Sequence, residues 1–330
     1  MINIGIIGLG SFADAHIKAI SEVSGVLLKA VCRTNFEKLE QFCSQYNIQG
    51  YTDYKELLQN KEIDAVVIVT PHHLHTQVAI DAAKYGKHIL LEKPMAPTVD
   101  ECQQIINAAE KENVTLMLGQ TLRFNPICTY AKQLIDSNKL GAIVMGSATL
   151  AKNWADDERK PWHIKKNSHG GILKTVGIHY IDLMSYLFGS EVESVFASIN
   201  STFNDFETDD VVSLLLRFKN KAEAHIICTG YIQGERKMEA EIYCKGGILK
   251  IDVEKGIYLK KNEEKTLIKS VIFEEGMQDA LCKEWEEFRD SIIEKRMPSV
   301  SGKQGLHLMA VIEAAFRSSK LKKEIFINQN

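Results

Sequence analysis

The sequence lacks the features that would assign it to several common functional classes. Its seven cysteines stand singly, and no pair has C-x-x-C or metal-ligand spacing, so we expect reduced thiols in a reducing compartment. No apolar run approaches the length of about 20 residues that a membrane span needs, and the first residues show no signal-peptide pattern. The net charge of −3 offers no positive surplus for nucleic acid or an anionic membrane. These absences predict a cytoplasmic protein with neither kind of partner.

What the sequence does contain is typical of a globular protein with two domains. Of its 330 residues, 45% are hydrophobic and 25% are charged, which is enough apolar material for a sizeable core. Over residues 1–120, short apolar runs alternate with amphipathic helical patterns. The expected strands cover residues 4–7, 26–31, 63–69, 88–91 and 114–118, and the expected helices cover residues 11–21, 36–46, 53–59, 74–85 and 98–111. This alternation predicts an α/β fold with a doubly wound parallel sheet.

The first expected strand runs directly into a glycine pattern, Gly8-Leu9-Gly10-Ser11-Phe12-Ala13. Gly8 permits a tight turn, Gly10 lets a pyrophosphate approach the backbone, and Ala13 lets the helix pack closely on the strand. The helix beginning at Ser11 directs its free N–H groups and its dipole toward a phosphate. Any α/β protein can place glycines between a strand and a helix, but the order strand, turn, helix favours a dinucleotide site.

The end of the second expected strand bears on which dinucleotide binds. A site for NAD usually has an acidic residue about 20 residues after the glycines, where it binds the ribose hydroxyls. Here Arg33 and Thr34 occupy that position. Arg33 is suited to stack on adenine and pair with a 2′-phosphate, and Thr34 can donate a hydrogen bond to it. The pattern favours NADP over NAD; alternatively, Arg33 only begins a solvated loop.

The character of the chain changes after residue 120. A helix is expected at 126–136, a strand at 143–150, a polar segment at 152–169 and a long helix from Gly170 to Phe188. Period-two runs then predict an antiparallel sheet with strands at 195–200, 211–218, 222–228, 238–244, 248–253, 257–259 and 266–273. Helices at 278–294 and 303–319 complete the chain. The helices suffice for one face of this sheet, so we expect a second copy to cover the other.

One candidate catalytic residue is Lys93, within Glu92-Lys93-Pro94. The triplet follows a parallel strand at its carboxyl end, which is where open α/β sheets bind ligands. Burial beside a nicotinamide would lower the pKa of the lysine and let it hold or exchange a proton near neutrality. Pro94 would fix the turn. The simpler alternative is a surface lysine after a strand.

A second candidate lies on the helix that follows Gly170-Gly171. Thr175 and His179 are four residues apart and share one helical face, and Asp182 is placed to orient the imidazole. A histidine is the natural proton carrier when a hydroxyl becomes a carbonyl. Taken alone, however, a histidine is more often structural than catalytic.

Other signals are weaker. Trp162 and His163 fall in the polar segment 152–169, where an aromatic face would suit a sugar ring or would anchor a surface loop. Arg123 follows the last strand of the first domain, so it could bind substrate or form an ion pair at the domain junction.

In this order and spacing, the motifs resemble the Gfo/Idh/MocA family of oxidoreductases over nearly the whole chain. The matching residues are Gly8 to Ala13, Thr70-Pro71 followed by His75, Gly86-Lys87-His88, Glu92-Lys93-Pro94, Arg123-Phe124-Asn125-Pro126 and the helix from Gly170 to Asp182. The Glu-Lys-Pro triplet and the later G-x-H-x-x-D are specific to this family, whereas the glycine turn is not.

The resemblance implies a Rossmann domain at residues 1–120 and a substrate-binding and oligomerisation domain at residues 121–330, the latter an α+β domain with a large open, mainly antiparallel sheet. It also implies a nicotinamide cofactor, hydride transfer at a carbinol carbon of a sugar or cyclitol, and assembly through the open sheet as a homodimer or homotetramer. No metal is implied, although His72, His73 and His75 lie close together in the sequence.

The resemblance also assigns roles to residues. Lys93 takes the position of the lysine that contacts the substrate hydroxyl and the cofactor, and His179 that of the acid/base histidine. Thr175 stands where many members have an aspartate; it can hydrogen-bond substrate but cannot accept a proton as a carboxylate does. The expected cofactor contacts come from Gly8, Gly10, Ser11, Phe12, Ala13, Arg33, Thr34, Thr70, Pro71, His75, Glu92 and Lys93. The expected substrate contacts come from Arg123, Trp162, His163, Thr175 and His179.

The sequence therefore predicts an NAD(P)-dependent dehydrogenase or reductase that acts on a secondary alcohol or ketone of a sugar, sugar derivative or cyclitol. Three alternatives remain open on the same scaffold: a dihydrodiol or other carbonyl reductase, a redox-assisted glycosidase, and a cofactor-binding regulator without turnover.

Overall fold

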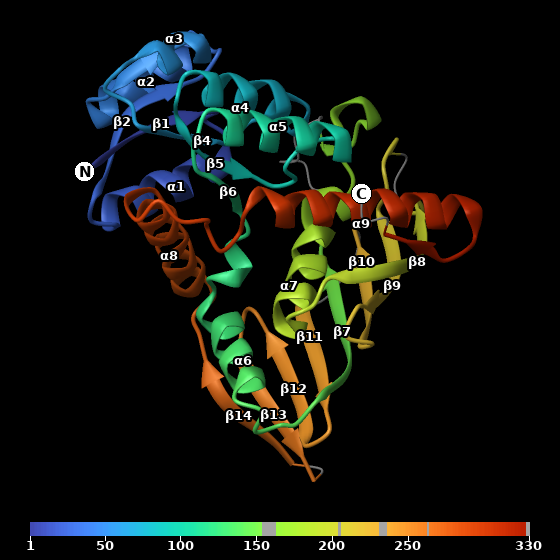
Figure 1. Ribbon diagram of the computed structural model, residues 1–330. Helices are drawn as coiled ribbons and strands as arrows, with labels where there is room; N and C mark the ends of the chain where they lie inside the picture. The colour runs from blue at the N-terminus through green and yellow to red at the C-terminus, as the bar shows by residue number, and fades with distance from the viewer. Residues whose placement is uncertain (154–162, 204–205, 231–235, 263, 328–330) are drawn as a thin grey trace. The chain divides into compact units, whose positions relative to one another are not determined.

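The computed structural model describes residues 1–153, 163–203, 206–230, 236–262 and 264–327. The chain forms two compact units (Figure 1). The first contains Met1–Thr121 and Gln278–Leu306, and the second contains Leu122–Met277 and His307–Asn330. A single boundary at residue 120 does not describe this division, because residues 278–306 return to the first unit.

The first unit is built on a six-stranded sheet in the order β3-β2-β1-β4-β5-β6, with every neighbouring pair parallel. Its strands are β1 (Ile2–Ile7), β2 (Val26–Cys32), β3 (Gln49–Tyr51), β4 (Ala65–Ile68), β5 (His88–Glu92) and β6 (Leu116–Gly119). The connecting helices are α1 (Ser11–Glu22), α2 (Phe36–Tyr46), α3 (Tyr54–Gln59), α4 (His75–Lys84) and α5 (Val99–Lys111). The predicted doubly wound parallel sheet is confirmed, although the sequence analysis missed β3, which has only three residues.

Local sequence explains where these helices begin. The Asp53 carboxylate accepts from the Lys55 amide at 2.8 Å, so Asp53 caps α3. Thr98 caps α5 by accepting from the Glu101 amide at 3.3 Å, and the hydroxyl of Thr98 donates to the Glu101 carboxylate. Helices α4 and α5 lie side by side on the sheet (Figure 1). Because the strands are parallel, the connecting helices follow the carboxyl ends of the strands, at the edge of the sheet where the predicted cofactor residues lie.

The second unit is built on a nine-stranded sheet in the order β14-β13-β12-β11-β7-β10-β9-β8-β15. Its strands are β7 (Ile143–Ala151), β8 (Val192–Asn200), β9 (Val211–Phe218), β10 (Glu223–Thr229), β11 (Lys237–Cys244), β12 (Gly247–Asp252), β13 (Gly256–Lys261), β14 (Glu264–Ser270) and β15 (Ile325–Phe326). All pairs are antiparallel except β7 with β10, so the sheet is mainly but not wholly antiparallel. The long connection after β7 supplies the crossover that a parallel pair requires.

Two helices, α6 (Pro126–Asp136) and α7 (Ile178–Phe188), lie on one face of this sheet (Figure 1). Alternation along the strands buries the side chains under these helices, such as Ala148 and Ile226. On the opposite face, Phe196, Leu215 and Ile227 remain 45%, 38% and 39% exposed. The expected long helix from Gly170 to Phe188 instead begins with a π-helix at Leu173–Gly177, which α7 continues.

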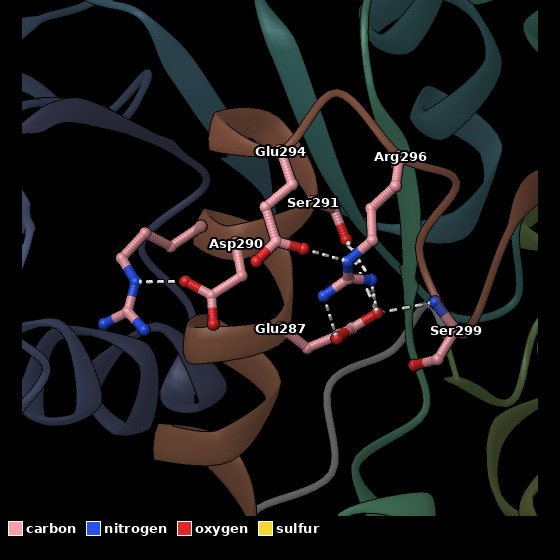
Figure 2. Close-up of polar contacts among 7 residues, drawn as sticks. Glu287, Asp290, Ser291, Glu294, Arg296 and Ser299 are labelled. Atoms are coloured by element: carbon pink, nitrogen blue, oxygen red, sulfur yellow. Dashed lines mark hydrogen bonds and ion pairs between the residues drawn. The ribbon is translucent and has the colours of Figure 1, made fainter.

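The C-terminal part of the chain contains two long helices, α8 (Phe273–Ile293) and α9 (Gly302–Leu321). Helix α8 begins at Phe273, and β14 ends at Ser270. The prediction that the last strand extends to Phe273 was therefore wrong. The loop after α8 is fixed by Glu287, whose carboxylate accepts two hydrogen bonds from Arg296 at 2.8 Å and one from the Ser299 amide at 2.7 Å (Figure 2). The next residue, Val300, then accepts from the amide of Leu118 in β6.

Among the described residues, no helix is long and apolar enough to cross a membrane.

Candidate functional site

The glycine turn after β1 has the geometry of an anion-binding turn. Gly8 has a φ of +101°, and a Cβ added there would lie 2.6 Å from the carbonyl oxygen of Val69, so only glycine fits. Gly10 is the N-cap of α1 and presents bare backbone at the start of the helix. Ala13 is fully buried against the sheet, as expected, while Phe12 is 37% exposed. The turn therefore offers backbone N–H groups and a helix dipole to a phosphate.

Arg33 lies beside this turn. Its Nη1 donates to the carbonyl oxygen of Leu9, between the two glycines, at 3.0 Å. Thr34 follows and is exposed. The structure therefore brings the guanidinium at the end of β2 to the glycine turn, 24 residues away in sequence. A guanidinium held there has the charge and the fork geometry to bind a phosphate oxygen.

The loop after β4 supplies the next group of residues. The hydroxyl oxygen of Thr70 is buried and has no hydrogen-bond partner among the described residues, so it is available to a ligand. Pro71 leads into a short turn before α4. The buried His75 ring places Nε2 2.9 Å from the Thr70 carbonyl and Nδ1 2.8 Å from the Pro94 carbonyl. Burial lowers the pKa of His75, against the opposing effect of these two carbonyls.

Lys93 occupies the turn after β5. It is half-buried, its backbone amide donates to Glu92 Oε2 at 3.2 Å, and its peptide bond to Pro94 is cis. Burial lowers the pKa of Lys93, and the Glu92 carboxylate only partly offsets this. The ammonium group can therefore release its proton more readily than that of an exposed lysine.

Behind Lys93 lies a buried polar network that sequence reasoning missed. Glu92 Oε1 is 3.1 Å from Nε2 of His16 in α1, and the Trp285 indole donates to His16 Nδ1 at 3.1 Å. Glu284, also buried, has its pKa raised by burial and by the charge of Glu92. His16 lies three residues after Ala13, on the buried side of α1, and that spacing was the available signal for its role. Trp285 and Glu284 come from a distant part of the sequence and gave no such signal.

In the second unit, the candidate residues gather on the helix after Gly170. Thr175 lies in the π-helix and His179 in the first turn of α7, and both are half-buried. Asp182 is 1% exposed, and both of its carboxylate oxygens accept from Arg123, at 2.8 and 2.7 Å. The expected partner of Asp182 was His179, but this carboxylate is already engaged by a guanidinium. Arg123 itself is 13% exposed, and its ion pair lies within the second unit rather than at a domain junction.

The start of this helix is fixed by Asp209, which sequence reasoning also missed. Its carboxylate accepts from the amide of Leu173 at 2.8 Å, and its backbone carbonyl accepts from the amide of Ile172 at 3.0 Å. Gly171 has a φ of +101°, and a Cβ there would overlap the Asp209 carboxylate. Burial raises the pKa of Asp209 to about 6. A buried acid thus sets the position from which the helix that carries Thr175 and His179 begins.

Two further predicted residues belong to the segment before this helix. The carbonyl of His163 accepts from the amide of Gly171 at 2.9 Å, so His163 adjoins the same turn. Trp162 lies outside the described residues. Within the described part of the chain, no group of three or more His, Cys, Asp or Glu side chains is placed to hold a metal ion.

The predicted residues therefore form two clusters, one in each unit. The carboxyl edge of the parallel sheet brings together the glycine turn, Arg33, Thr70, His75 and Lys93. The second cluster consists of Arg123 and the residues on the helix after Gly170.

Comparisons with known proteins agree with this geometry. A family model described as an oxidoreductase family with an NAD-binding Rossmann fold matches residues 2–120, and a GFO/IDH/MocA C-terminal domain model matches residues 128–250. Glucose-6-phosphate 3-dehydrogenase of Bacillus subtilis is 32% identical over 237 residues, covering 69% of this chain and 67% of that protein. Myo-inositol 2-dehydrogenase of Thermotoga maritima is 25% identical over 343 residues and covers 99% of each chain.

A solved structure of levoglucosan dehydrogenase with NADH and levoglucosan superimposes with a TM-score of 0.90 at 23% identity, covering 99% of this chain and 100% of that one. At this level of identity the likeness shows the fold alone.

Proposed function

Because the chain belongs to the Gfo/Idh/MocA oxidoreductase family, we propose that it transfers hydride between NADP and a secondary alcohol or ketone of a sugar or cyclitol. The observation that carries the proposal is Lys93. It lies at the carboxyl edge of the parallel sheet, on the same edge as the glycine turn, and burial has lowered its pKa. Relatives named as dehydrogenases of glucose 6-phosphate and myo-inositol support the substrate class.

The residues of the first unit fit a dinucleotide. Gly8 and Gly10 leave the backbone open to a pyrophosphate, and the free hydroxyl of Thr70 offers a polar contact at the next strand end. In this proposal the glycine turn holds the pyrophosphate, and the residues after β4 and β5 hold the nicotinamide half. When bound, the nicotinamide accepts or supplies the hydride.

In the proposed reaction, this chain's own side chains manage the proton and the oxygen. His179 takes the hydroxyl proton during oxidation and returns it during reduction. The ammonium of Lys93 hydrogen-bonds the substrate oxygen and stabilises the negative charge that develops on it. Thr175, one helical turn before His179, hydrogen-bonds a neighbouring hydroxyl of the substrate and accepts no proton. The ion pair of Arg123 with Asp182 holds the helix that carries His179 and leaves the remaining guanidinium nitrogen for a substrate oxygen.

The choice of NADP rests on Arg33. Its guanidinium is held against the Leu9 carbonyl at the glycine turn, and no acidic side chain follows β2 directly. Changing Arg33→Asp should remove the 2′-phosphate contact and supply a ribose acceptor, shifting the ratio of kcat/KM for NADP over NAD by about a hundredfold or more toward NAD. Thr34→Ala is the matched control and should shift the ratio only slightly. A wild-type enzyme with a clear preference for NAD would contradict the argument.

We also propose that the exposed face of the large sheet binds a second copy of this chain. Phe196 and Leu215 are paired across β8 and β9, and Ile227 lies on the same face in the next strand. Leu215→Glu should then convert a dimer or tetramer to smaller species in sedimentation velocity, whereas a substitution at Glu264, in the edge strand β14, should not. A monomeric wild-type protein would contradict this.

The main test follows the absorbance of reduced nicotinamide over a panel of hexoses, inositols, sugar phosphates and dihydrodiols. Lys93→Met and His179→Asn should each lower kcat by about 100-fold or more on any substrate that the wild-type enzyme turns over. Tight cofactor binding without turnover on any of these compounds would contradict the proposal. It would favour a regulator or redox-assisted glycoside cleavage, and glycosides would be tested next.

A further inference from the structure

Two buried histidines contact the turn that carries Lys93, one on each side of the lysine. His16 of α1 contacts the side chain of Glu92, which precedes Lys93. His75 of α4 contacts the carbonyl of Pro94, which follows Lys93. Both rings have 0% exposure, so these contacts are not in competition with bulk water.

We propose that His16 and His75 are positioning residues that clamp the Glu92–Lys93–Pro94 turn and couple it to the two loops that hold the cofactor. This inference rests on the proposed function, because it assigns the two histidines a role through Lys93.

The coupling follows from where the two helices begin. Helix α1 starts at the glycine turn, and the ring of Phe12 in its first turn meets the His16 ring edge to face, with centroids 5.1 Å apart. Helix α4 starts after the Thr70–Pro71 loop, and His75 contacts the carbonyl of Thr70 as well as that of Pro94. Each histidine therefore joins one cofactor loop to the turn of Lys93.

The two rings differ in their hydrogen-bond patterns. The Trp285 indole can only donate, so Nδ1 of His16 must be an acceptor and its proton lies on Nε2, which donates to Glu92. His75 faces two carbonyl oxygens, which can only accept. It makes both hydrogen bonds only when both ring nitrogens carry protons, and it retains one bond after one proton leaves. The charged groups facing His75 are Glu92 and Lys93, and the His72 ring adjoins it at 5.9 Å.

Because of this difference, we expect replacement by glutamine to preserve kcat at His16 and to lower it at His75. A glutamine has one acceptor and one donor group, as neutral His16 has, so His16→Gln should keep kcat within about threefold of the wild type. His16→Leu should lower kcat by about 10- to 100-fold, because a small misplacement of Lys93 reduces catalysis strongly. At His75, Gln has both of its donors on one nitrogen and sets an oxygen that can only accept against the other carbonyl. His75→Gln should therefore lower kcat, and His75→Leu, which donates to neither carbonyl, should lower it further. His73→Gln, at an exposed neighbouring position, is the matched control and should match the wild type.

A measurement on the wild-type protein tests the clamp without substrate. Nitrogen-15 NMR of histidine-labelled protein should show His16 with its proton on Nε2, and Trp285→Phe should remove this fixed tautomer. Because burial lowers the pKa of His75, its ring should take up a second proton only below the ordinary histidine range, and both ring nitrogens should then carry protons. The His75 signals would be assigned from the His75→Gln variant. A His75 without a hydrogen-bonded ring N–H, or a His16 protonated on Nδ1, would overturn the clamp.

The kinetic outcomes separate this inference from the function on which it rests. If Lys93→Met leaves turnover intact, the proposed role of Lys93 is wrong. If Lys93→Met abolishes turnover while folded His16→Leu and His75→Leu enzymes keep wild-type kcat, only the clamp is wrong. Rescue by His16→Gln without rescue by His75→Gln would support it, since a merely structural loss of packing would not distinguish the two positions in this way.

Discussion

Glu92 in the first unit and Asp209 in the second do the same work on two different elements. Each is a buried acid whose carboxylate accepts a backbone N–H of the element that carries a candidate catalytic residue, at Lys93 and Leu173 respectively. Each also requires a neighbouring glycine, because a Cβ at Gly119 would lie 2.6 Å from Glu92 Oε1 and one at Gly171 would overlap Asp209.

They differ in what else surrounds them. Glu92 is shared by His16 and the Lys93 amide, and its charge lies beside a lysine. Asp209 accepts from backbone amides, and burial raises its pKa to about 6. The comparison indicates that the same anchoring geometry can hold an acid within a side-chain network or one that contacts backbone amides and whose pKa burial raises to about 6.

The largest expected effect comes from closing the space beside Asp209. Gly171→Ala combines a positive φ with overlap of a carboxylate, and should lower the free energy of unfolding by about 4 kcal/mol. Gly119→Ala introduces overlap without a positive φ and should cost about 2 kcal/mol. Denaturant unfolding measures both. Gly86→Ala is the matched control, since Gly86 has a φ of +70° with open space around it, and about 1 kcal/mol is expected from strain alone. Equal losses at all three positions would show that neither carboxylate is fixed.

The pH dependence of stability should reveal the ionisation of Asp209. Its folded-state pKa of about 6 lies above the ordinary value of 3.8, so the folded state binds the proton more tightly. The stability of the second unit should therefore fall by about 2–3 kcal/mol as the pH rises from 4 to 6, and stay constant above that. Asp209→Asn should abolish this component of the slope. Urea unfolding at pH 4 and pH 7, monitored for the second unit, measures it, and an unchanged slope in the variant would contradict the assignment.

Glu92→Gln should change catalysis, and its effect should not follow the pH range over which Asp209 ionises. Removing the carboxylate removes the charge that raises the pKa of Lys93, so the lysine-dependent limb of the kcat/KM profile should move to lower pH. We expect kcat to fall about tenfold. A glutamine side chain has one accepting oxygen, so it cannot accept from both His16 and the Lys93 amide as the two carboxylate oxygens of Glu92 do. Asp209→Asn, assayed in parallel, should leave that limb in place. A limb that moves equally in both variants would mean that it does not report Lys93.

The smallest effect concerns a third acid with the same geometry but less burial. Glu287 accepts from Arg296 and from the Ser299 amide, and these bonds lower its pKa although burial opposes them (Figure 2). The contribution of Glu287 to the free energy of unfolding is therefore present above about pH 4–5 and lost as the pH falls. The contribution of Asp209 has the opposite pH dependence. Glu287→Gln should cost about 1 kcal/mol at pH 7 and less at pH 3 by thermal or urea unfolding. Glu294→Gln, an exposed partner of the same arginine, is the control and should change stability by under about 0.5 kcal/mol.

Local sequence patterns predicted the structural features that depend on residues close together in the sequence. The alternation of strands and helices predicted the parallel sheet, and the glycine pattern predicted the tight turn at Gly8, which has a positive φ. The position of Lys93 at the end of β5 could be predicted for the same reason, since the strand end and the lysine are adjacent in the sequence.

The sequence by itself determined the fold of the first unit and the identity of Lys93 and His179 as candidates, because hydrophobic period, turn chemistry and helix spacing act within a few residues. Only the tertiary structure decided what holds them. Trp285 reaches His16 across 269 positions, and Asp209 reaches Leu173 across 36. A buried polar group must find a partner wherever the fold brings one, and that choice is made by packing in three dimensions, which no local pattern records.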